Sequence, residues 1–542
     1  MHTETANFRC TACWFDAGSS LKFVVTAATV ESVRDHRNAV VRMCRDRIPT
    51  AAGRARPSGR PHFGSTTRAN ELAMSRTLIT GGTIVNATGT CTADVLVDGE
   101  RIVAVLDAQT VLGGSPAAEK VIDATGKYVI PGGVDAHTHM EMPFGGTNAS
   151  DTFETGTRAA AWGGTTTIVD FVVQKAGENP LRQYELWHEK AGGNCAIDYG
   201  FHQILSDVDD ASLAAMDELV HEGVTSFKFF MAYKGVFLSD DGQILRGMQR
   251  ASDNGALIMM HAENGSVIDV LVQQSIARGD TAPYHHGLTR PWQAEAEATH
   301  RAIMLADITG APLYIVHVSA KQAVEQIAAA RDNGRNVFAE TCPQYLYLSL
   351  EEHLGAPGFE GAKWVCSTPL RSRAEGHQHH MWQGLRTNDL QVVSTDHCPF
   401  CMNGQKDLGR NDFSKIPNGI GSVEHRMDLL YQGVVLGEIS LPRWVEICST
   451  TPARMFGMYG KKGVIQPGAD ADIVIYDPNG RTHISAETHH MNIDHSAWEG
   501  FEVDGHVDTV LSRGQVVVDR NTFHGRTGHG QYIKRGLSQY LI

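Results

Sequence analysis

The middle of the chain, residues 132–455, alternates short apolar runs with longer stretches of helical periodicity. Eight of the apolar runs have the length of strands: residues 134–139, 166–172, 199–204, 226–232, 256–261, 313–318, 336–341 and 392–395. Continuous apolar strands separated by helices indicate a parallel sheet that helices cover on both faces. Eight such units predict an α/β fold of the (β/α)8, TIM-like barrel type. A doubly wound sheet is the alternative, but the Gly-rich turn expected after its first strand is absent.

The two segments that flank this region are rich in short strands and turns. Six strands are predicted in them: residues 77–86, 93–97, 101–106, 472–476, 507–511 and 515–518. The turn Asp98-Gly99 joins two of these strands in a hairpin. We therefore predict that residues 74–131 and 456–520 together form one small β-sandwich domain beside the barrel of residues 132–455. Residues 521–542 are expected to be a C-terminal tail.

The first 73 residues differ in character from the rest. They contain 11 Lys or Arg and 6 Asp or Glu, whereas the whole chain has a net charge of −14. Residues 54–68 are a run of Arg, Pro, Gly and Ser, which is typical of an unfolded segment. Acidic residues such as Glu4 and Asp16 argue against a transit peptide. We expect the functional chain to begin near Met74 and residues 1–73 to be a disordered or non-native extension.

Composition and charge exclude several classes of protein. Hydrophobic residues make up 42% of the 542 residues and charged residues 20%, which is ordinary for a globular protein. The acidic balance argues against a nucleic-acid partner. No apolar run approaches the length that a membrane span needs. Ten cysteines are too few for a disulfide scaffold, and no signal peptide is recognised, so we expect a cytoplasmic protein.

Metal-binding residue types stand at the carboxyl ends of the predicted strands, where barrel active sites lie. These residues are His137, His139, Lys228, His261, His317 and Asp396. Residues i and i+2 of a strand face the same side, so His137 and His139 point together. Imidazole and carboxylate groups suit zinc and similar divalent ions, and four histidines on three strands predict a metal centre. Glu295 and Glu297, by contrast, are expected on the solvated edge of one helix.

Lys228 is the unusual member of this set, because a protonated amine would repel metal cations. Burial and neighbouring positive charge both disfavour the ammonium form, so its pKa should fall. A neutral amine can react with carbon dioxide to give an anionic carbamate whose two oxygens could bridge two metals. A lysine that forms an ion pair with a carboxylate at the barrel mouth is the alternative, and the residue type alone does not decide between them.

Long motifs surround these residues. They read PGGVDAHTHMEMPFGG at 131–146, DTFETGTRAAAWGGTTTIVDF at 151–171, SFKFFMAYKG at 226–235, HAENG at 261–265, PLYIVHVS at 312–319, STDHCPF at 394–400 and KIPNG at 415–419. With the predicted metal residues, they resemble the dihydropyrimidinase and D-hydantoinase branch of the binuclear amidohydrolase superfamily. The resemblance runs from about residue 76 to residue 520. The segment CSTPLR at 366–371 departs from the family pattern, because Thr368 stands where proline is usual.

The resemblance implies a centre of two zinc ions in each subunit. It assigns one ion to His137 and His139, the other to His261 and His317, and the bridge between them to Lys228. Lys228 would then be N6-carboxylysine, a carbamate derived from CO2. Asp396 would bind the first metal and act as the catalytic base.

The resemblance also implies residues that contact the substrate. Tyr233 matches the tyrosine that contacts the substrate carbonyl, and Ser367 and Asn418 match positions whose backbones hold the ring amide. A hydrophobic wall for the exocyclic group would consist of Met142, Phe144, Phe230 and Phe237.

The activity that the resemblance implies is hydrolysis of a cyclic amide. The substrates would be small cyclic amides or ureides: dihydrouracil, dihydrothymine or a 5-substituted hydantoin, opened to an N-carbamoyl amino acid. Relatives that act on dihydroorotate use an arginine after the His-x-His pair, where this chain has Met140-Glu141-Met142. An allantoinase is the closest alternative enzyme. A non-catalytic scaffold is a second alternative, but all six ligand positions are intact. The resemblance further implies a homotetramer.

Overall fold

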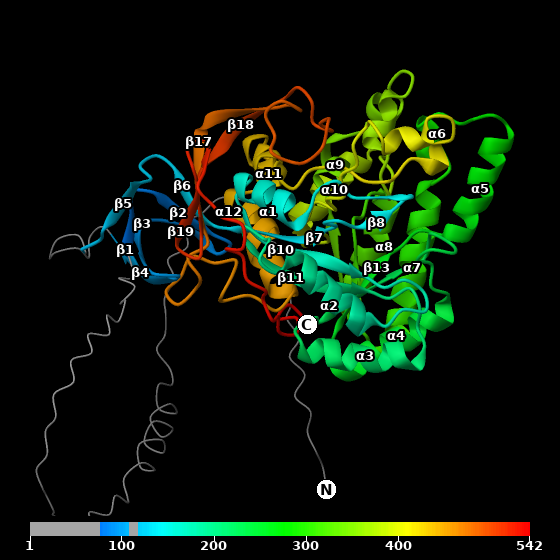
Figure 1. Cartoon of the computed structure of the whole chain (residues 1–542), viewed down its shortest axis with the longest axis horizontal. Coiled ribbons are helices and arrows are strands. Elements are labelled where there is room, and N and C mark those ends of the chain that lie inside the picture. The colour runs from blue at the N-terminus through cyan, green and yellow to red at the C-terminus, as the bar shows by residue number, and fades with distance from the viewer. Residues whose placement is uncertain (1–75, 108–116, 542) are drawn as a thin grey trace, which may run out of the picture. The chain divides into compact units, whose positions relative to one another are not determined.

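A parallel β-barrel forms the centre of the computed structural model, which describes residues 76–107 and 117–541 (Figure 1). The predicted extension, residues 1–73, lies outside the described residues. The barrel strands follow one another around the sheet in chain order: β7 (Gly133–Thr138), β10 (Thr165–Val173), β11 (Asp198–Ile204), β12 (Ser226–Phe230), β13 (Leu257–His261), β14 (Leu313–Ile315), β15 (Val337–Thr341) and β16 (Val392–Val393). Each predicted barrel strand overlaps one of these, so the predicted (β/α)8 architecture is confirmed.

Helices surround the barrel and join its strands (Figure 1). They are α1 (Phe153–Trp162), α2 (Pro180–Ala191), α3 (Asp210–His221), α4 (Asp241–Asn254), α5 (Gly265–Ala277), α6 (Tyr284–Leu288), α7 (Trp292–Thr309), α8 (Lys321–Asp332), α9 (Pro343–Tyr347), α10 (His377–Thr387), α11 (Arg426–Val435), α12 (Leu441–Val445) and α13 (Thr451–Met455). Short helical turns lie at Leu350–Leu354, Glu360–Trp364, Lys406–Gly409, Phe413–Lys415 and Glu446–Thr450. Helix α4 illustrates why they form: Asp240 and Gln243 make a reciprocal cap at its start, and Gly255 ends it in the left-handed conformation.

Buried polar side chains close the barrel between its first and last strands. Asp135 on β7 accepts hydrogen bonds from the backbone N–H of Thr395 (3.1 Å) and from its hydroxyl (2.6 Å). The fully buried Arg426 donates to the carbonyl oxygens of Val134 (3.2 Å) and Val393 (2.9 Å). Satisfied buried polar groups of this kind fix one arrangement. The closure brings the residue after Thr395, which is Asp396, next to the end of β7.

A second sheet contains strands from both flanking segments (Figure 1). Its strands are β1 (Arg76–Thr80), β2 (Thr83–Asn86), β3 (Gly89–Asp98), β4 (Arg101–Asp107), β5 (Lys120–Asp123), β6 (Tyr128–Pro131), β17 (Ile473–Ile484), β18 (Phe501–Ser512), β19 (Gln515–Asp519) and β20 (Thr522–Phe523). The predicted hairpin is confirmed as the antiparallel pair β3–β4. The single strand predicted over residues 77–86 is wrong, because Gly81, at φ +73°, breaks it into β1 and β2.

The residues expected to be a C-terminal tail return to the barrel. The Tyr199 N–H on β11 donates to the Gln531 carbonyl (3.0 Å), and the Ile533 N–H donates to the Tyr199 carbonyl (2.7 Å). Arg535 is only 3% exposed and donates to the Ser226 hydroxyl (3.0 Å). This C-terminal segment therefore packs against barrel strands.

A cluster of buried charges joins the second sheet to the barrel. The Lys462 ammonium lies 2.7 Å from Asp198 on β11, 3.1 Å from Asp470 and 2.5 Å from Asp472. Arg513, after β18, also contacts Asp198 at 3.0 Å. These three carboxylates stand close enough to hold a metal ion, but the lysine already supplies their cation.

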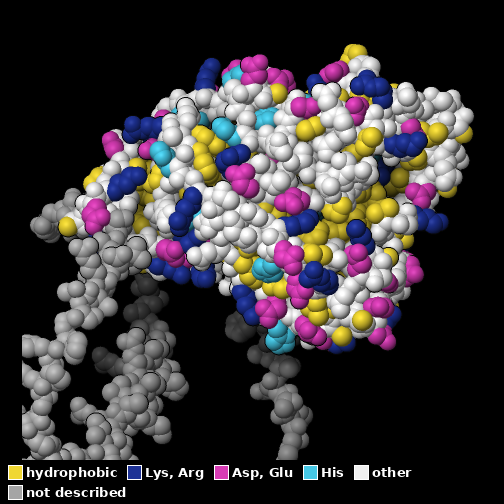
Figure 2. Space-filling view, in the orientation of Figure 1, with side chains coloured by type: hydrophobic (Ala, Val, Ile, Leu, Met, Phe, Trp, Pro, Cys, Tyr) yellow, Lys and Arg dark blue, Asp and Glu magenta, His cyan; other side chains and the backbone are white. Residues whose placement is uncertain are grey.

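The surface shows no segregation of charge on the face drawn in Figure 2, where basic and acidic side chains are interspersed. In the described part of the chain, no helix is both long and apolar enough to cross a membrane.

Candidate metal centre

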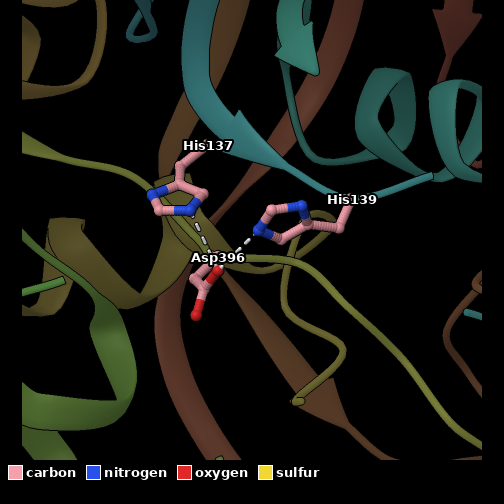
Figure 3. A group of neighbouring side chains, drawn as sticks. All are labelled: His137, His139 and Asp396. Atoms are coloured by element: carbon pink, nitrogen blue, oxygen red, sulfur yellow. Dashed lines mark ion pairs between the residues drawn. The ribbon is translucent and has the colours of Figure 1, made fainter. Parts of the chain in front are cut away.

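Three of the predicted metal residues meet at the carboxyl end of β7. The Nε2 atoms of His137 and His139 both point at one oxygen of Asp396, at 3.1 and 3.2 Å (Figure 3). Both histidines are buried. Two nitrogens and a carboxylate oxygen that converge from separate strands match the ligand types of a divalent metal site.

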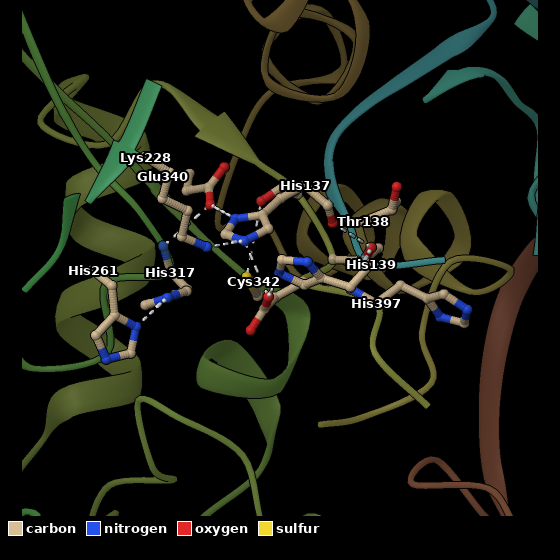
Figure 4. A network of polar contacts seen from close by, with 12 residues as sticks. His137, Thr138, His139, Lys228, His261, His317, Glu340, Cys342 and His397 are labelled. Carbon is tan, nitrogen blue, oxygen red and sulfur yellow. Dashed lines mark hydrogen bonds and ion pairs between the residues drawn. The ribbon is translucent and has the colours of Figure 1, made fainter. Parts of the chain in front are cut away.

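The other predicted ligands form a second group beside the first (Figure 4). Nδ1 of His261, at the end of β13, lies 3.0 Å from Nε2 of His317, which follows β14. Nζ of Lys228, on β12, lies 2.8 Å from Nε2 of His137. The ring centres of His137 and His317 are 5.5 Å apart, so the two groups are neighbours with Lys228 at their junction. The structure therefore brings all six predicted residues into one centre.

The charge states of these side chains suit metal binding. Burial lowers the pKa of His139 to about 3 and also lowers the pKa of His261, so both imidazoles are neutral and have lone pairs to share. Burial lowers the pKa of Lys228 to about 8, against the opposing effect of Asp396 and Glu340. Although burial opposes it, the contact with His137 and His139 holds the pKa of Asp396 well below its usual range. Neutral imidazole nitrogens can bind a cation, whereas Glu340 and Asp396 raise the pKa of His137 against the effect of burial.

Buried carboxylates that the sequence did not single out orient two of the histidines. Glu340 on β15 contacts Nδ1 of His137 and accepts from the backbone N–H of His317 (3.2 Å). Glu263 accepts from Nε2 of His261 (2.9 Å) and from the buried Arg290 (2.6 Å). Such partners fix the ring orientation of metal-binding histidines. Glu263 lies two residues after His261. A carboxylate so close in sequence to a predicted ligand could have indicated its role in orienting that histidine.

Glu295 also differs from its prediction. It is 2% exposed, accepts from the backbone N–H of Ser319 (2.8 Å), and forms a 2.6 Å ion pair with Arg371. The solvated position expected for it is therefore wrong, because a partner 76 residues away neutralises its charge. Since Ser319 lies two residues after His317, Glu295 stabilises the loop that carries this histidine.

A partly open pocket of about 420 Å³ lies over the centre. It is lined by every residue that the sequence placed against the substrate: Met142, Phe144, Phe230, Tyr233, Phe237, Ser367 and Asn418. Phe144 and Phe237 stack at 6.1 Å between ring centres, and Phe230 stacks on Phe237 at 5.0 Å. This aromatic wall offers an apolar surface to a substrate group.

The polar end of the pocket is held in one arrangement by hydrogen bonds. The Asn418 side-chain amide donates to the Tyr233 hydroxyl (3.3 Å) and to the Ser367 hydroxyl (2.9 Å). Tyr233 has a φ of +65°, and His317 and Asp396 also have positive φ, at +38° and +51°. Non-glycine residues in this left-handed region are uncommon and concentrate at functional sites.

Comparison with known proteins identifies the class to which this fold and centre belong. The model of the Amidohydrolase family matches residues 128–517, more than half of the chain, and the chain belongs to this family. The family predicted from the sequence is thus confirmed.

Within the family, the chain is most informatively compared with three proteins. It is 64% identical over 467 residues to a D-hydantoinase of Streptomyces coelicolor, and the matched region covers 86% of this chain and 99% of the relative. It is 50% identical over 460 residues to a D-hydantoinase of Geobacillus stearothermophilus, covering 84% and 96%. The crystal structure of a dihydropyrimidinase from Brevibacillus agri matches with a TM-score of 0.83 and 50% identity, covering 85% of this chain and 99% of that one. The predicted resemblance to the dihydropyrimidinase and D-hydantoinase branch is confirmed.

Proposed function

We propose that this protein hydrolyses the cyclic amide bond of 5-substituted hydantoins and 5,6-dihydropyrimidines to give N-carbamoyl amino acids. The observation that carries the proposal is the convergence of His137, His139, Lys228, His261, His317 and Asp396 in one centre beneath an aromatic pocket. The similarity to D-hydantoinases and a dihydropyrimidinase over nearly their whole length supports the same reaction.

The centre would hold two divalent ions, which we propose to be zinc. His137, His139 and Asp396 would bind one ion, and His261 and His317 the other, with Lys228 as a carbamate between them. Such ions lower the pKa of water and polarise a carbonyl group. The neutral His139 and His261 and the lowered pKa of Lys228 fit this occupancy.

Asp396 is the group that moves the proton. Its carboxylate is ionised because of its contacts with His137 and His139, and it lies at the floor of the pocket. The attacking water forms a bond from its oxygen to the amide carbon and gives a proton to Asp396. When the carbon–nitrogen bond breaks, Asp396 returns that proton to the departing ring nitrogen, so that one carboxylate serves as base and then as acid.

Tyr233 stabilises the negative oxygen that forms during this attack. Asn418 donates to the oxygen of the Tyr233 hydroxyl, which leaves the hydroxyl proton free to donate to the substrate. Burial raises the pKa of Tyr233, so the hydroxyl stays protonated. One pre-placed donor of this kind contributes about 3–4 kcal/mol to catalysis.

The pocket wall favours apolar substituents over charged ones. Phe144, Phe230 and Phe237 face the space above the centre. Among the described residues that line the pocket, Lys228 is the only lysine or arginine, and it belongs to the metal centre. A dihydroorotate carboxylate would lose its water without gaining a partner there. The polar ureido group of allantoin would meet the same wall.

The test is a comparison of kcat/KM for dihydrouracil, a 5-substituted hydantoin, allantoin and dihydroorotate with zinc-loaded protein. We expect turnover of the first two and little turnover of the others. A higher kcat/KM for dihydroorotate or allantoin would overturn the substrate assignment. Absence of turnover with all four would favour a non-catalytic role. The homotetramer and the cytoplasmic location stay predictions.

A further inference from the structure

Lys406 is a buried charge outside the metal centre. It opens the turn Lys406–Gly409, its side chain is 0% exposed, and no carboxylate of the described chain lies within ion-pair distance of its ammonium. Burial lowers its pKa to about 7, against the opposing effect of Cys366 and Cys398, so that about half of this amine is an ammonium at pH 7. Burying an ammonium without a counter-ion costs free energy of folding, so a functional role would explain why a lysine stands at this position.

The contacts of Lys406 are two backbone carbonyls on separate loops. Its ammonium donates to the carbonyl oxygens of Val365 and Pro417, both at 3.2 Å. The Val365 carbonyl also accepts from the Gly419 N–H at 2.9 Å, so the two loops are joined at this point. One loop leads to Ser367 and the other to Asn418, the two residues whose backbones are expected, from the family resemblance, to hold the ring amide of the substrate.

The Pro417 carbonyl belongs to the same peptide group as the N–H of Asn418. Within the described part of the chain, that N–H donates to no other group, and Asn418 lines the pocket. An ammonium on the carbonyl side draws electron density from the peptide group and makes its N–H a stronger donor, since hydrogen bonds in a chain polarise one another.

We propose that Lys406 is a positioning residue for substrate binding: by donating to the Pro417 carbonyl, it strengthens the Asn418 N–H as a donor to the substrate ring. The proposal rests on the proposed function, because it concerns the same ring. It assigns a role to a residue that touches neither the centre nor the substrate. It also accounts for a buried charge that opposes stability.

The test compares Lys406→Met with the wild-type protein. Methionine keeps much of the apolar stem and removes the charge and its donors. We expect the KM for a 5-substituted hydantoin to rise by about threefold to tenfold, because Lys406 no longer polarises the peptide group whose Asn418 N–H donates to the substrate. We expect kcat to change by less than about threefold, the signature of lost ground-state binding. The melting temperature should stay the same or rise, since an unpaired buried charge is removed.

Lys415→Met is the matched control, because Lys415 is nearby in sequence, pairs with Asp412 and has a side chain that is 69% exposed. It should leave KM and melting temperature unchanged. Lys406→Gln keeps an N–H donor without the charge and should give a smaller rise in KM than Lys406→Met. Bound zinc should equal the wild-type value in all three variants.

Two results would overturn the proposal. One is a KM for Lys406→Met within about twofold of wild type. The other is a rise in KM that comes with a lower melting temperature, lost zinc or failure of both Lys406 variants to fold, which would make the lysine merely structural. Wild-type protein that turns over no cyclic amide would instead refute the proposed function, before any variant is compared.

Discussion

Replacing Lys228 by alanine tests whether this lysine is a carbamate ligand or a structural cation. Its pKa of about 8 means that about one amine in ten is neutral at pH 7. An ordinary lysine with a pKa of 10.5 has only about one in three thousand in that form. The buried position thus raises the fraction that can react with carbon dioxide by a factor of about 300.

The expected result for Lys228→Ala follows from the contacts of the side chain. Its Nζ lies 2.8 Å from His137 at the junction of the two ligand groups, so alanine removes the side chain proposed to bridge them. Bound zinc should fall from two ions per chain to one or fewer, measured by elemental analysis, and turnover should fall at least about a thousandfold.

Rescue experiments separate the two interpretations of Lys228. A short carboxylic acid such as acetate should restore part of the zinc and part of the turnover in Lys228→Ala, whereas methylamine should not. Lys228→Arg should also fail, because a guanidinium group stays protonated and forms no carbamate. A Lys228→Ala protein that retains two zinc ions and near-normal turnover would show that the lysine is structural and would refute the reasoning.

Three further predictions concern other parts of the chain. Tyr233→Phe should lower kcat/KM by about 100- to 1,000-fold with unchanged zinc content, and a loss below about tenfold would remove Tyr233 from the mechanism. Glu295→Ala should lower the free energy of unfolding in urea by about 3–5 kcal/mol, because it leaves the buried Arg371 without its ion-pair partner. The matched control Glu297→Ala, whose side chain is 49% exposed, should cost less than about 1 kcal/mol, and equal losses would contradict the argument. A chain that begins at Met74 should keep the activity and melting temperature of the full-length protein, and loss of folded protein would show that residues 1–73 are needed.

The barrel could be predicted from sequence because its strands are buried on both faces. Strand β10, for example, is buried at all nine positions, and its sequence TTTIVDFVV consists mostly of the β-branched and aromatic residues that favour strands. The small sheet was harder to predict, because its strands are short and the break at Gly81 falls between two apolar runs that can be read as one strand. The contact of residues 529–535 with the barrel could not be predicted, because the segment has no periodic pattern. Tyr532 and Arg535 are instead held by hydrogen bonds to residues that are distant in sequence.

The residues of the candidate site also fall into two groups, those that the sequence could predict and those that it could not. Residues at strand ends, such as His137 and Asp396, have positions that the fold itself dictates, so they could be predicted. Buried charges such as Glu263, Glu295 and Lys406 resemble surface residues in sequence, because each depends on a partner that only the folded chain brings near. Their roles follow from distances, not from local patterns.

The most direct test of the central claim is identification of the product by mass spectrometry. Zinc-loaded protein is incubated with a 5-substituted hydantoin in parallel with Asp396→Ala protein of equal concentration. The account predicts that the wild-type protein adds one water to the ring and yields the N-carbamoyl amino acid, whereas Asp396→Ala yields none above background. An unchanged hydantoin with the wild-type protein, or equal product from both proteins, would contradict it.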